Sequence, residues 1–446
     1  MGIALALTLT SCAQVVTGTA APAPLPPTAA VAAPAPAAAA GSSRSDAVAA
    51  AATRMLQEFW ARTFPAAFGR EWDDIDTFAG VHTDTPGTLP PPCIDRAADL
   101  AGQAFYCPAA DAVAWDADGL VPGLYERFGP AGVVVVLAHE VGHAVQSRLG
   151  VDDAQAREPE RYPTILLEAM ADCYAGVAVA HLVAEPADGV PMGLAERDEA
   201  LGALVGFSDP LGVDSADRSA HGNAFDRVSA FQDGYRMGAD GCAGMSPDNR
   251  DFTQRRFGSD ADAARGGDLP LPQLLPAVVG EARSWYEGVV EGGRAPAVET
   301  AASCPGRVGA AQGPVAYCAA SGVVTVDRVA LAGLHREFGD FAGATLVASR
   351  YGIALLDATG RDTTGTRAGA AATCLAGAYT ARLIDPPAGF RLSPGDLDEA
   401  VQILLAGDWA ARDAAGEADP AEHGFERVAR FRTGLLEGSA ACLAIA

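Results

Sequence analysis

The spacing of the cysteines constrains the fold of this chain more than any other feature of its sequence. Nine cysteines occur in 446 residues; Cys12 stands alone, and the other eight form two sets of four. In both sets the first two cysteines are 14 residues apart, and the last two are 69 or 68 residues apart; the sets are Cys93, Cys107, Cys173 and Cys242, then Cys304, Cys318, Cys374 and Cys442. This internal period predicts two copies of one domain in tandem.

Short segments between the cysteines repeat in the same order. The matching pairs are residues 123–129 (GLYERFG) with 333–339 (GLHREFG), 173–176 (CYAG) with 374–377 (CLAG), and 225–228 (FDRV) with 425–428 (FERV). We therefore predict a first domain over residues 46–245, a connector over residues 246–263, and a second, homologous domain over residues 264–446.

The N-terminal residues indicate export. An apolar run at residues 2–10 precedes Cys12, and an Ala/Pro-rich stretch follows it. The run is too short to cross a bilayer, which needs roughly 20 apolar residues. It resembles the end of a bacterial lipoprotein signal. That resemblance implies a signal over residues 1–12, a lipid anchor on Cys12 and a semi-rigid linker over residues 13–45. The protein is then expected at the outer face of the cell membrane, or secreted if Cys12 carries no lipid.

In an exported chain, four cysteines per copy most simply form two disulfides per copy. Four cysteines allow three connectivities. We favour pairing Cys93 with Cys107 and Cys173 with Cys242, together with the equivalent pairs Cys304 with Cys318 and Cys374 with Cys442. Metal binding by these cysteines is the less favoured alternative, because no C-x-x-C pair occurs in the chain.

The first copy contains a segment with the residues of a metal site. An apolar run at residues 131–138 leads into the sequence HEVGH at residues 139–143. Pro130 suits the first turn of a helix and Gly150 suits its end, so we predict one buried helix over residues 131–149.

Residues four apart lie on one face of a helix, so the imidazoles of His139 and His143 can bind one metal ion. Glu140 follows directly and is long enough to reach a water molecule on that metal. This H-E-x-x-H arrangement is typical of zinc peptidases, in which the metal activates the water and the glutamate takes its proton.

A catalytic zinc needs a third protein ligand and an open position for water. Residues 165–176 predict a second apolar helix, on which Glu168 and Asp172 share one face. We assign Glu168 as the third ligand and Asp172 as the group that holds a histidine N–H, because the spacing resembles the gluzincin pattern. His181 and His221 are the other candidates for the third ligand.

Together these segments resemble the bacterial family of "putative neutral zinc metallopeptidases". The resemblance is carried by FYCP at residues 105–108, HEVGHAVQ at 139–146, the stretch 168–176, and HG at 221–222. It covers the first copy almost entirely and the second only in degenerate form. It implies a helix-dominated α+β fold of the zincin type, one zinc ion per chain held by His139, His143 and Glu168, and Glu140 as general base.

The second copy lacks every residue assigned to the metal. The replacements are His139 by Ser349, Glu140 by Arg350, His143 by Ile353, Glu168 by Gly369, and Asp172 by Thr373. The cysteines and glycines persist, which is expected if they hold the fold and the lost residues serve the metal. We therefore predict that only the first copy is active.

The same comparison bears on other candidates. His221 and Arg227 keep their counterparts, His423 and Arg427, in the copy without ligands, which favours structural roles for both. Tyr174 and Tyr235 are leucines in the second copy; either could act near the metal, although an ordinary buried aromatic side chain is favoured.

The charged-residue composition limits the classes of binding partner. The 31 basic residues are all arginine and face 56 acidic ones, for a net charge of −25. This charge argues against nucleic acid and anionic membrane surfaces as partners. We predict a zinc peptidase acting on peptide or protein substrates, with membrane contact only through Cys12. The alternative is a lipid-anchored, non-enzymatic binding or scaffold protein with a zinc site. The oligomeric state stays open.

Overall fold

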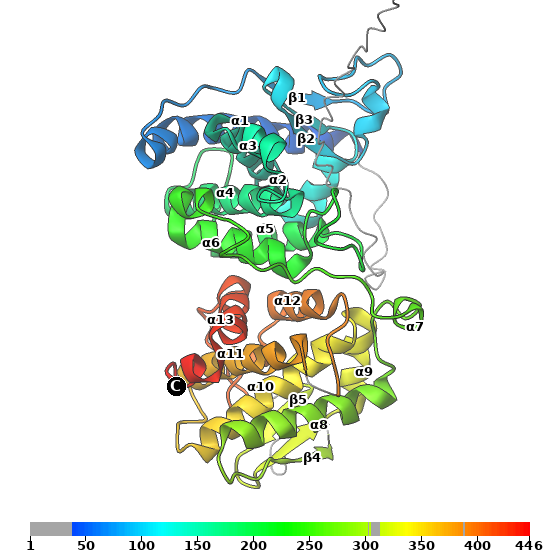
Figure 1. Ribbon diagram of the computed structural model, residues 1–446, viewed down its shortest axis with the longest axis vertical. Coiled ribbons are helices and arrows are strands. Elements are labelled where there is room, and N and C mark those ends of the chain that lie inside the picture. The colour runs from blue at the N-terminus through cyan, green and yellow to red at the C-terminus, as the bar shows by residue number, and fades with distance from the viewer. Residues whose placement is uncertain (1–37, 302, 305–312, 387–388) are drawn as a thin grey trace, which may run out of the picture.

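The computed structural model describes residues 38–301, 303–304, 313–386 and 389–446. Cys12, the predicted signal and the predicted linker as far as residue 37 lie outside the described residues. Helices dominate the described chain and two small sheets accompany them, which confirms the predicted α+β class. Figure 1 shows the elements gathered into an upper and a lower unit.

The first unit combines a small sheet with a set of packed helices. Its elements are α1 (Ala38–Phe68), β1 (Thr77–Val81), β2 (Ala104–Cys107), β3 (Ala112–Asp116), α2 (Leu120–Leu149), α3 (Val151–Arg157), α4 (Thr164–Ala184), α5 (Leu194–Gly206) and α6 (Ala224–Ala243). Strand β3 lies in the middle of the sheet, parallel to β1 and antiparallel to β2.

The second unit repeats this plan. The short helix α7 (Asp260–Ala263) precedes it, and its elements are α8 (Leu271–Val289), β4 (Ala297–Thr300), β5 (Val315–Cys318), β6 (Val323–Val326), α9 (Arg328–Glu337), α10 (Asp340–Ala358), α11 (Thr366–Ile384), α12 (Asp396–Ala406) and α13 (Gly424–Leu443). Strand β6 is central, parallel to β4 and antiparallel to β5, so the two sheets share one topology.

Helix α2 is bent where its sequence changes character. Gly129 has a φ of 60° and interrupts the helix, and Pro130 then begins a straight segment that ends at Leu149. Gly150 closes it with a φ of 81°, a left-handed conformation that glycine adopts without a Cβ clash. The predicted helix over residues 131–149 is therefore present, preceded by one further stretch of helix.

Helices α2 and α4 form the core of the first unit. By length and composition both are apolar enough to cross a membrane, but 78% and 89% of their most apolar windows are buried inside the protein. Such burial is what the core helices of a folded domain show, because a helix that is apolar all round must be covered.

Glycines allow the core helices to touch. A Cβ on Gly142 of α2 would lie 2.8 Å from the carbonyl oxygen of Ala171 on α4, and a Cβ on Gly234 of α6 would lie 1.7 Å from that of Cys173. In the second unit, a Cβ on Gly434 would lie 1.7 Å from the carbonyl oxygen of Cys374. Corresponding helices therefore cross at corresponding residues in the two units.

Four disulfides join the cysteines in the pairs that we favoured from their spacing. The Cα–Cα distances are 6.0 Å for Cys93–Cys107, 5.6 Å for Cys173–Cys242, 5.5 Å for Cys304–Cys318 and 5.3 Å for Cys374–Cys442. In each unit, the disulfide that closes the longer loop joins two helices, α4 with α6 or α11 with α13. These are the helices that Gly234 and Gly434 allow to approach closely, so this disulfide holds the close pair together.

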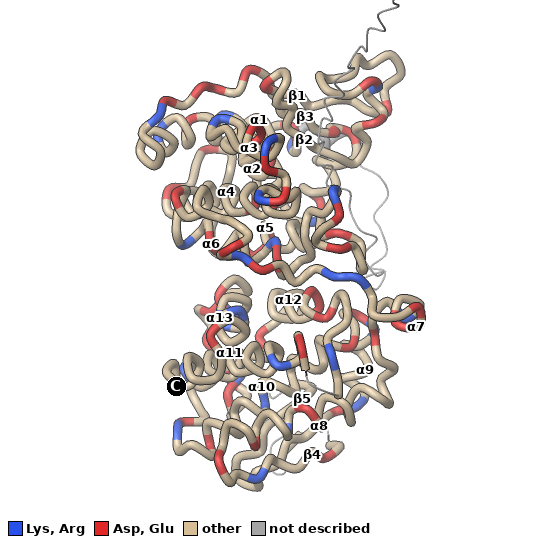
Figure 2. Tube along the Cα trace, viewed as in Figure 1, with Lys and Arg blue, Asp and Glu red and all other residues tan. Residues whose placement is uncertain are grey.

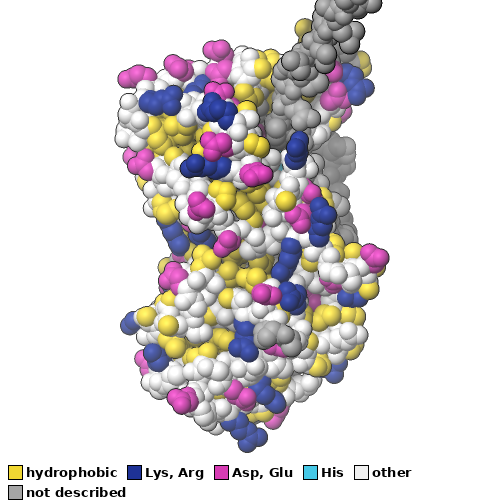
Figure 3. Space-filling view, viewed as in Figure 1, with side chains coloured by type: hydrophobic (Ala, Val, Ile, Leu, Met, Phe, Trp, Pro, Cys, Tyr) yellow, Lys and Arg dark blue, Asp and Glu magenta, His cyan; other side chains and the backbone are white. Residues whose placement is uncertain are grey.

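The two units meet through α5 and α6 on one side and α12 and α13 on the other (Figure 1). Arg197 of α5 pairs with Glu426 of α13 at 2.8 Å, and Arg432 of α13 pairs with Asp233 of α6 at 2.6 Å. Figure 2 shows acidic residues spread over both units, and in Figure 3 the surface narrows at the junction between them.

The predicted connector is packed rather than free. The backbone N–H groups of Thr253 and Gln254 donate to the carboxylate of Asp226 in the first turn of α6. The guanidinium of Arg255 donates to two carbonyl oxygens of the second unit, those of Ile384 and Leu392. The connector therefore contributes contacts to both units.

Candidate metal centre

The crossing of α2 and α4 brings the assigned metal ligands together. His139 and His143 lie one turn apart on α2, and Glu168 lies on the facing side of α4. Gly142 stands between the two histidines and packs directly on the backbone of α4 at Ala171. Without that close approach, the carboxylate of Glu168 could not reach both imidazoles.

The donor atoms are spaced as a zinc ion requires. Nε2 of His139 lies 3.2 Å from Nε2 of His143, and Oε2 of Glu168 lies 3.2 Å from the first and 3.6 Å from the second. A tetrahedral zinc with bonds of 2.0–2.1 Å has ligand atoms about 3.3 Å apart. Oε2 of Glu168 is buried and lacks a hydrogen-bond partner among the described residues. The three side chains therefore fit a zinc ion.

A buried chain of polar contacts fixes His139 from behind. Its Nδ1 lies 2.7 Å from Oδ1 of Asp172, so that the ring donates to the carboxylate and keeps Nε2 free as a donor atom for a metal. The guanidinium of Arg227 holds the same carboxylate with two hydrogen bonds, of 2.8 and 2.9 Å. Such outer contacts set the orientation and basicity of a metal ligand.

Arg227 was interpreted from sequence as structural, and the structure adds a contact with Asp172, the residue that holds His139. Among the described residues, the equivalent Arg427 donates only to backbone carbonyl oxygens, including that of Leu404 at 2.7 Å. Arg227 also donates to a carbonyl, that of Phe207, but its other two N–H groups reach Asp172. Persistence of the arginine in both units concealed this difference, because one residue type serves two different partners.

Gln146 supports the second histidine, and sequence reasoning assigned it no role. Its Oε1 lies 3.0 Å from Nδ1 of His143, and its Nε2 donates to the carbonyl oxygen of Leu167 at the start of α4. The spacing could have indicated this, since a residue three positions after a ligand on a helix faces the same side. Both histidines therefore have a fixed partner at Nδ1.

Glu140 lies in the same buried region. It is 1% exposed, and its Oε2 has no hydrogen-bond partner within the described part of the chain. Burial raises the pKa of Glu140, whereas the nearby His139 and His143 lower it. An unpaired carboxylate oxygen beside a metal site is free to accept a proton from a bound molecule.

The charges around the site favour a cation. Burial lowers the pKa of His139, but Asp172 and Glu168 outweigh burial and raise it to about 10. Burial raises the pKa of Glu168, and the charges of His143 and His221 reverse this and hold it well below its usual value. The negative potential that stabilises protons on the imidazoles also attracts a divalent cation in their place.

His221 lies near the site although its counterpart in the second unit suggested otherwise. Its Nδ1 lies 3.3 Å from Oδ1 of Asp209, and its buried Nε2 is unpaired among the described residues. Burial lowers the pKa of the ring and the charge of Glu168 raises it, with a net rise. His221 therefore faces the carboxylates of the site without belonging to the cluster of ligand atoms formed by His139, His143 and Glu168.

The remaining candidates lie elsewhere. His181 stacks on Phe59 at 5.0 Å between ring centres, and Tyr174 packs edge-on against Trp60 at 5.6 Å. Tyr235 contacts the ring of Phe425 across the junction, at 4.7 Å. These contacts are those of ordinary core and interface residues.

The equivalent place in the second unit is filled with packing contacts. The guanidinium of Arg350, which stands in the position of Glu140, donates to the carbonyl oxygen of Ala410 at 2.9 Å. A Cβ on Gly369, in the position of Glu168, would lie 1.9 Å from the carbonyl oxygen of Ala411. Ser349 and Thr373 donate to backbone carbonyls of their own helices. These residues offer no donor set for zinc.

Residues 91–243 match the family model described as "Putative neutral zinc metallopeptidase". Among curated proteins, the chain is similar to the uncharacterized protein Rv2575 of Mycobacterium tuberculosis and the uncharacterized protein Mb2605 of Mycobacterium bovis. Each is 33% identical over 151 residues, which is 30% of this chain and 52% of the relative. The chain thus spans about half the length of these relatives. No solved structure matches the chain. The matched region contains all three fitted metal ligands and Glu140, so the likeness to zinc metallopeptidases falls on the site described above.

Proposed function

We propose that the first unit is a zinc-dependent peptidase that hydrolyses peptide bonds in peptide or protein substrates. The observation that carries this proposal is the donor triangle of His139, His143 and Glu168, whose edges of 3.2, 3.2 and 3.6 Å suit one zinc ion. The family match at residues 91–243 supports the same chemistry. With three protein ligands, a zinc ion keeps one position open, as catalytic sites require.

The residues of the chain would divide the work. A zinc ion held here would supply Lewis acidity to the scissile carbonyl and to the attacking water. Glu140, with its unpaired buried oxygen, takes the proton of the water and delivers it to the leaving nitrogen. Asp172 and Gln146 hold the two imidazoles by their Nδ1 atoms, so that both Nε2 atoms stay directed at the metal.

The decisive experiment separates metal binding from turnover. Glu140→Gln should keep one zinc per chain by metal analysis and lose at least about 100-fold in cleavage of an unbiased peptide mixture, the contribution typical of a general base. Glu126→Gln, at an exposed position on the same helix, is the control and should retain full activity. A chelator should abolish cleavage and added zinc should restore it. Undiminished cleavage by the Glu140→Gln variant would remove the assigned base.

The second candidate function is a non-enzymatic binding or scaffold protein with a retained zinc site. The second unit supports this candidate, because its residues at the positions of the metal ligands make packing contacts instead, which leaves that unit free for a binding role. Zinc bound at one per chain, with no cleavage of any peptide in the mixture by the wild type, would select this function over peptidase activity.

We also propose that the second unit, residues 264–446, is a degenerate copy of the first, residues 46–245. The shared element order and strand topology support common ancestry, and the packed Arg350 supports loss of the metal site. Two zinc ions per chain would contradict this assignment.

Export, with a lipid anchor on Cys12, is the proposed location. Four disulfides support an oxidising compartment. Mass spectrometry of the mature N-terminus tests the anchor: an acylated Cys12 is expected, and an unmodified one would indicate ordinary secretion.

A further inference from the structure

The two units contact each other in a reciprocal way. Asp198 of α5 accepts hydrogen bonds from the first two backbone N–H groups of α13 in the second unit. Asp398 of α12 accepts from the backbone N–H of Phe225 in the first turn of α6 of the first unit. The residues around both carboxylates match, since Asp198-Glu199-Ala200 corresponds to Asp398-Glu399-Ala400. Each unit therefore supplies the carboxylate that caps a helix of the other.

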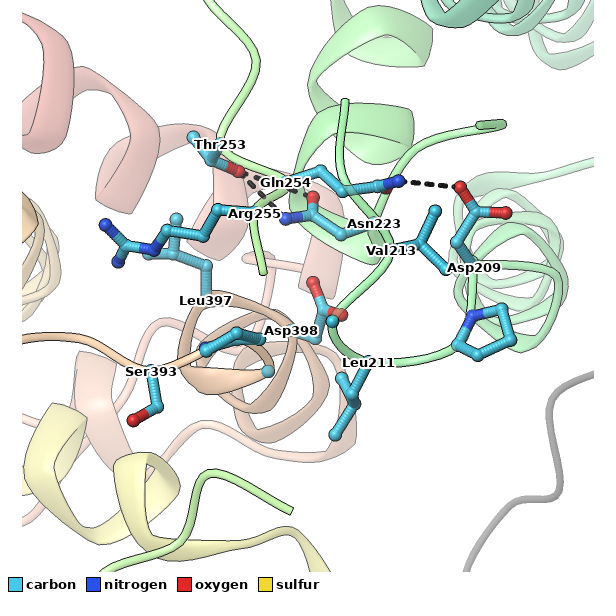
Figure 4. A pocket seen from close by; sticks show the side chains of 14 residues that line it. Asp209, Leu211, Val213, Asn223, Thr253, Gln254, Arg255, Ser393, Leu397 and Asp398 are labelled. Carbon is cyan, nitrogen blue, oxygen red and sulfur yellow. Dashed lines mark hydrogen bonds between the residues drawn. The ribbon is translucent and has the colours of Figure 1, made fainter. Parts of the chain in front are cut away.

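Helix α6 depends on this contact for part of its cap. The first N–H groups of a helix have no partner within the helix. The side chain of Asn223 caps this turn by accepting from the backbone N–H of Asp226, at 2.8 Å. The N–H of Phe225 instead reaches Oδ1 of Asp398 at 3.2 Å, and Ala224 and Phe225 are 0% and 4% exposed, so water cannot replace the carboxylate. Figure 4 shows Asp398 and Asn223 in the wall of the pocket between the units.

The capped turn of α6 leads directly to the metal site. Arg227 lies in this first turn, and its guanidinium holds Asp172, which in turn holds Nδ1 of His139. Within the part of the chain that the structure describes, the other cap has no such continuation, because Arg427 in the first turn of α13 donates to backbone carbonyls only. The two caps are therefore equivalent in position, but only the cap of α6 is followed by an arginine that contacts the metal site.

We propose that Asp398 is a positioning residue through which the second unit holds the metal site of the first unit in its binding geometry. Removal of the cap frees the first turn of α6, loosens the grip of Arg227 on Asp172, and lets the ring of His139 turn away from its partner ligands. This gives the second unit a task that needs no metal of its own. It rests on the proposed function only in that the first unit binds zinc.

The full-length chain provides its own matched control. Zinc affinity is measured by competition with a chromophoric chelator for the wild type, Asp398→Ala, Asp398→Asn and Asp198→Ala. Asp398→Ala should weaken zinc binding by about 10-fold or more, as loss of an outer contact to a metal ligand does. Asp198→Ala removes the equivalent cap and should change the affinity less than about 2-fold. Asp398→Asn keeps an accepting oxygen and should restore most of the affinity.

Amide hydrogen exchange measures the loosening of the first turn of α6 directly, without zinc or substrate. The amides of Ala224 and Phe225 should exchange faster in Asp398→Ala and stay protected in Asp198→Ala. If Asp398→Ala does not fold, Asp398→Ser and Asp198→Ser replace the pair, because serine keeps a polar group in the buried junction but is too short to take the place of the carboxylate, so zinc binding should again weaken in the Asp398 variant alone. Equal weakening of zinc binding by both members of a pair would overturn the proposal, and so would unchanged affinity in Asp398→Ala or in the serine variant that replaces it. A wild type that takes up no zinc would remove the proposed function together with this inference.

Discussion

Arg227 and Arg427 occupy equivalent positions but contact different kinds of group. Both sit in the first turn of equivalent helices, and both are buried. Arg427 satisfies backbone carbonyls, whereas Arg227 pairs with a carboxylate that is 0% exposed and itself holds a metal ligand. A buried carboxylate left without its cation is strongly destabilising. The side chain of Arg227 is therefore coupled both to stability and to metal binding.

Substitution of Arg227 should consequently affect both quantities. Arg227→Met removes the buried cation that pairs with Asp172 and should lower the free energy of unfolding by about 3 kcal/mol. It should also weaken zinc binding by about 10-fold to 100-fold. Arg427→Met, measured by the same denaturant unfolding and chelator competition, should lower stability while leaving zinc affinity near that of the wild type. Equal zinc affinities in the two variants would show that Arg227 is only structural.

Gln146 offers a test of the other histidine. Gln146→Leu introduces the residue that the second unit carries at the equivalent position, Leu356, and removes the acceptor for Nδ1 of His143. We expect zinc binding to weaken by about 10-fold, because the ring loses its fixed orientation. Gln146→Glu keeps an accepting oxygen and should bind zinc nearly as the wild type does. Full affinity in the leucine variant would mean that packing alone holds the ring.

The ligands were predictable because they lie on local patterns. His139 and His143 are separated by one helical turn, and so are Glu168 and Asp172. The spacing within each pair therefore predicts from sequence that both residues lie on one face of their helix. Arg227 could not be placed from sequence, since its partner Asp172 is 55 positions away and the contact depends on how α6 crosses α4. The role of His221 was obscured for the same reason, because proximity to Glu168 is a property of the packed fold.

At the scale of the elements, the geometry of the site depends on how closely α2 approaches α4. Gly142 has no side chain to separate the helices, and a Cβ there would lie 2.8 Å from the carbonyl oxygen and 2.9 Å from the Cα of Ala171. Both contacts are with backbone atoms, which cannot turn aside as a side chain can. The helices themselves would have to move apart.

Gly142→Ala should therefore damage both stability and metal binding. We expect a loss of about 1–3 kcal/mol in the free energy of unfolding, the usual effect of overpacking, and weaker zinc binding as Glu168 withdraws from the histidines. Gly123→Ala is the control on the same helix, because nothing lies within 4 Å of its added Cβ. It should be neutral or slightly stabilising, since alanine favours helix over glycine. A Gly142→Ala variant as stable as this control would show that α4 shifts freely.

Element boundaries followed from sequence where local residues decide them. Pro130 and Gly150 bracket the straight part of α2 because proline suits a first turn and glycine a left-handed end. The earlier part of α2, over residues 120–128, lacks such a boundary signal at its start and was not predicted. The disulfide pairs followed from spacing because both sets of cysteines have the same first interval and nearly the same last one.

At the scale of the whole molecule, the junction between the units buries acidic groups. Asp398 lies in the junction with Asp226 and Asp209 from the first unit, and burial, together with their charges, raises the pKa of Asp398 to about 7. Burial likewise raises the pKa of Asp226 to about 6. A net charge of −25 gave no sign of this, because composition does not reveal which carboxylates the units enclose when they meet.

These raised pKa values make stability depend on pH in a defined direction. The pKa of Asp398 is about 7 in the folded chain against an ordinary 3.8, so the folded state binds more protons than the unfolded state between these values. Stability must then fall as the pH rises from about 4 to about 7, and level off above.

Asp398→Asn removes this titration but keeps an oxygen for the cap of α6. The loss of stability between pH 5 and pH 8, measured by denaturant unfolding of zinc-saturated protein, should be about 2 kcal/mol smaller in Asp398→Asn than in the wild type. Titrating groups that do not interact with Asp398 cancel in this difference. Parallel pH profiles would show that the junction leaves Asp398 ionised throughout, and a steeper profile in the variant would reverse the sign assigned here.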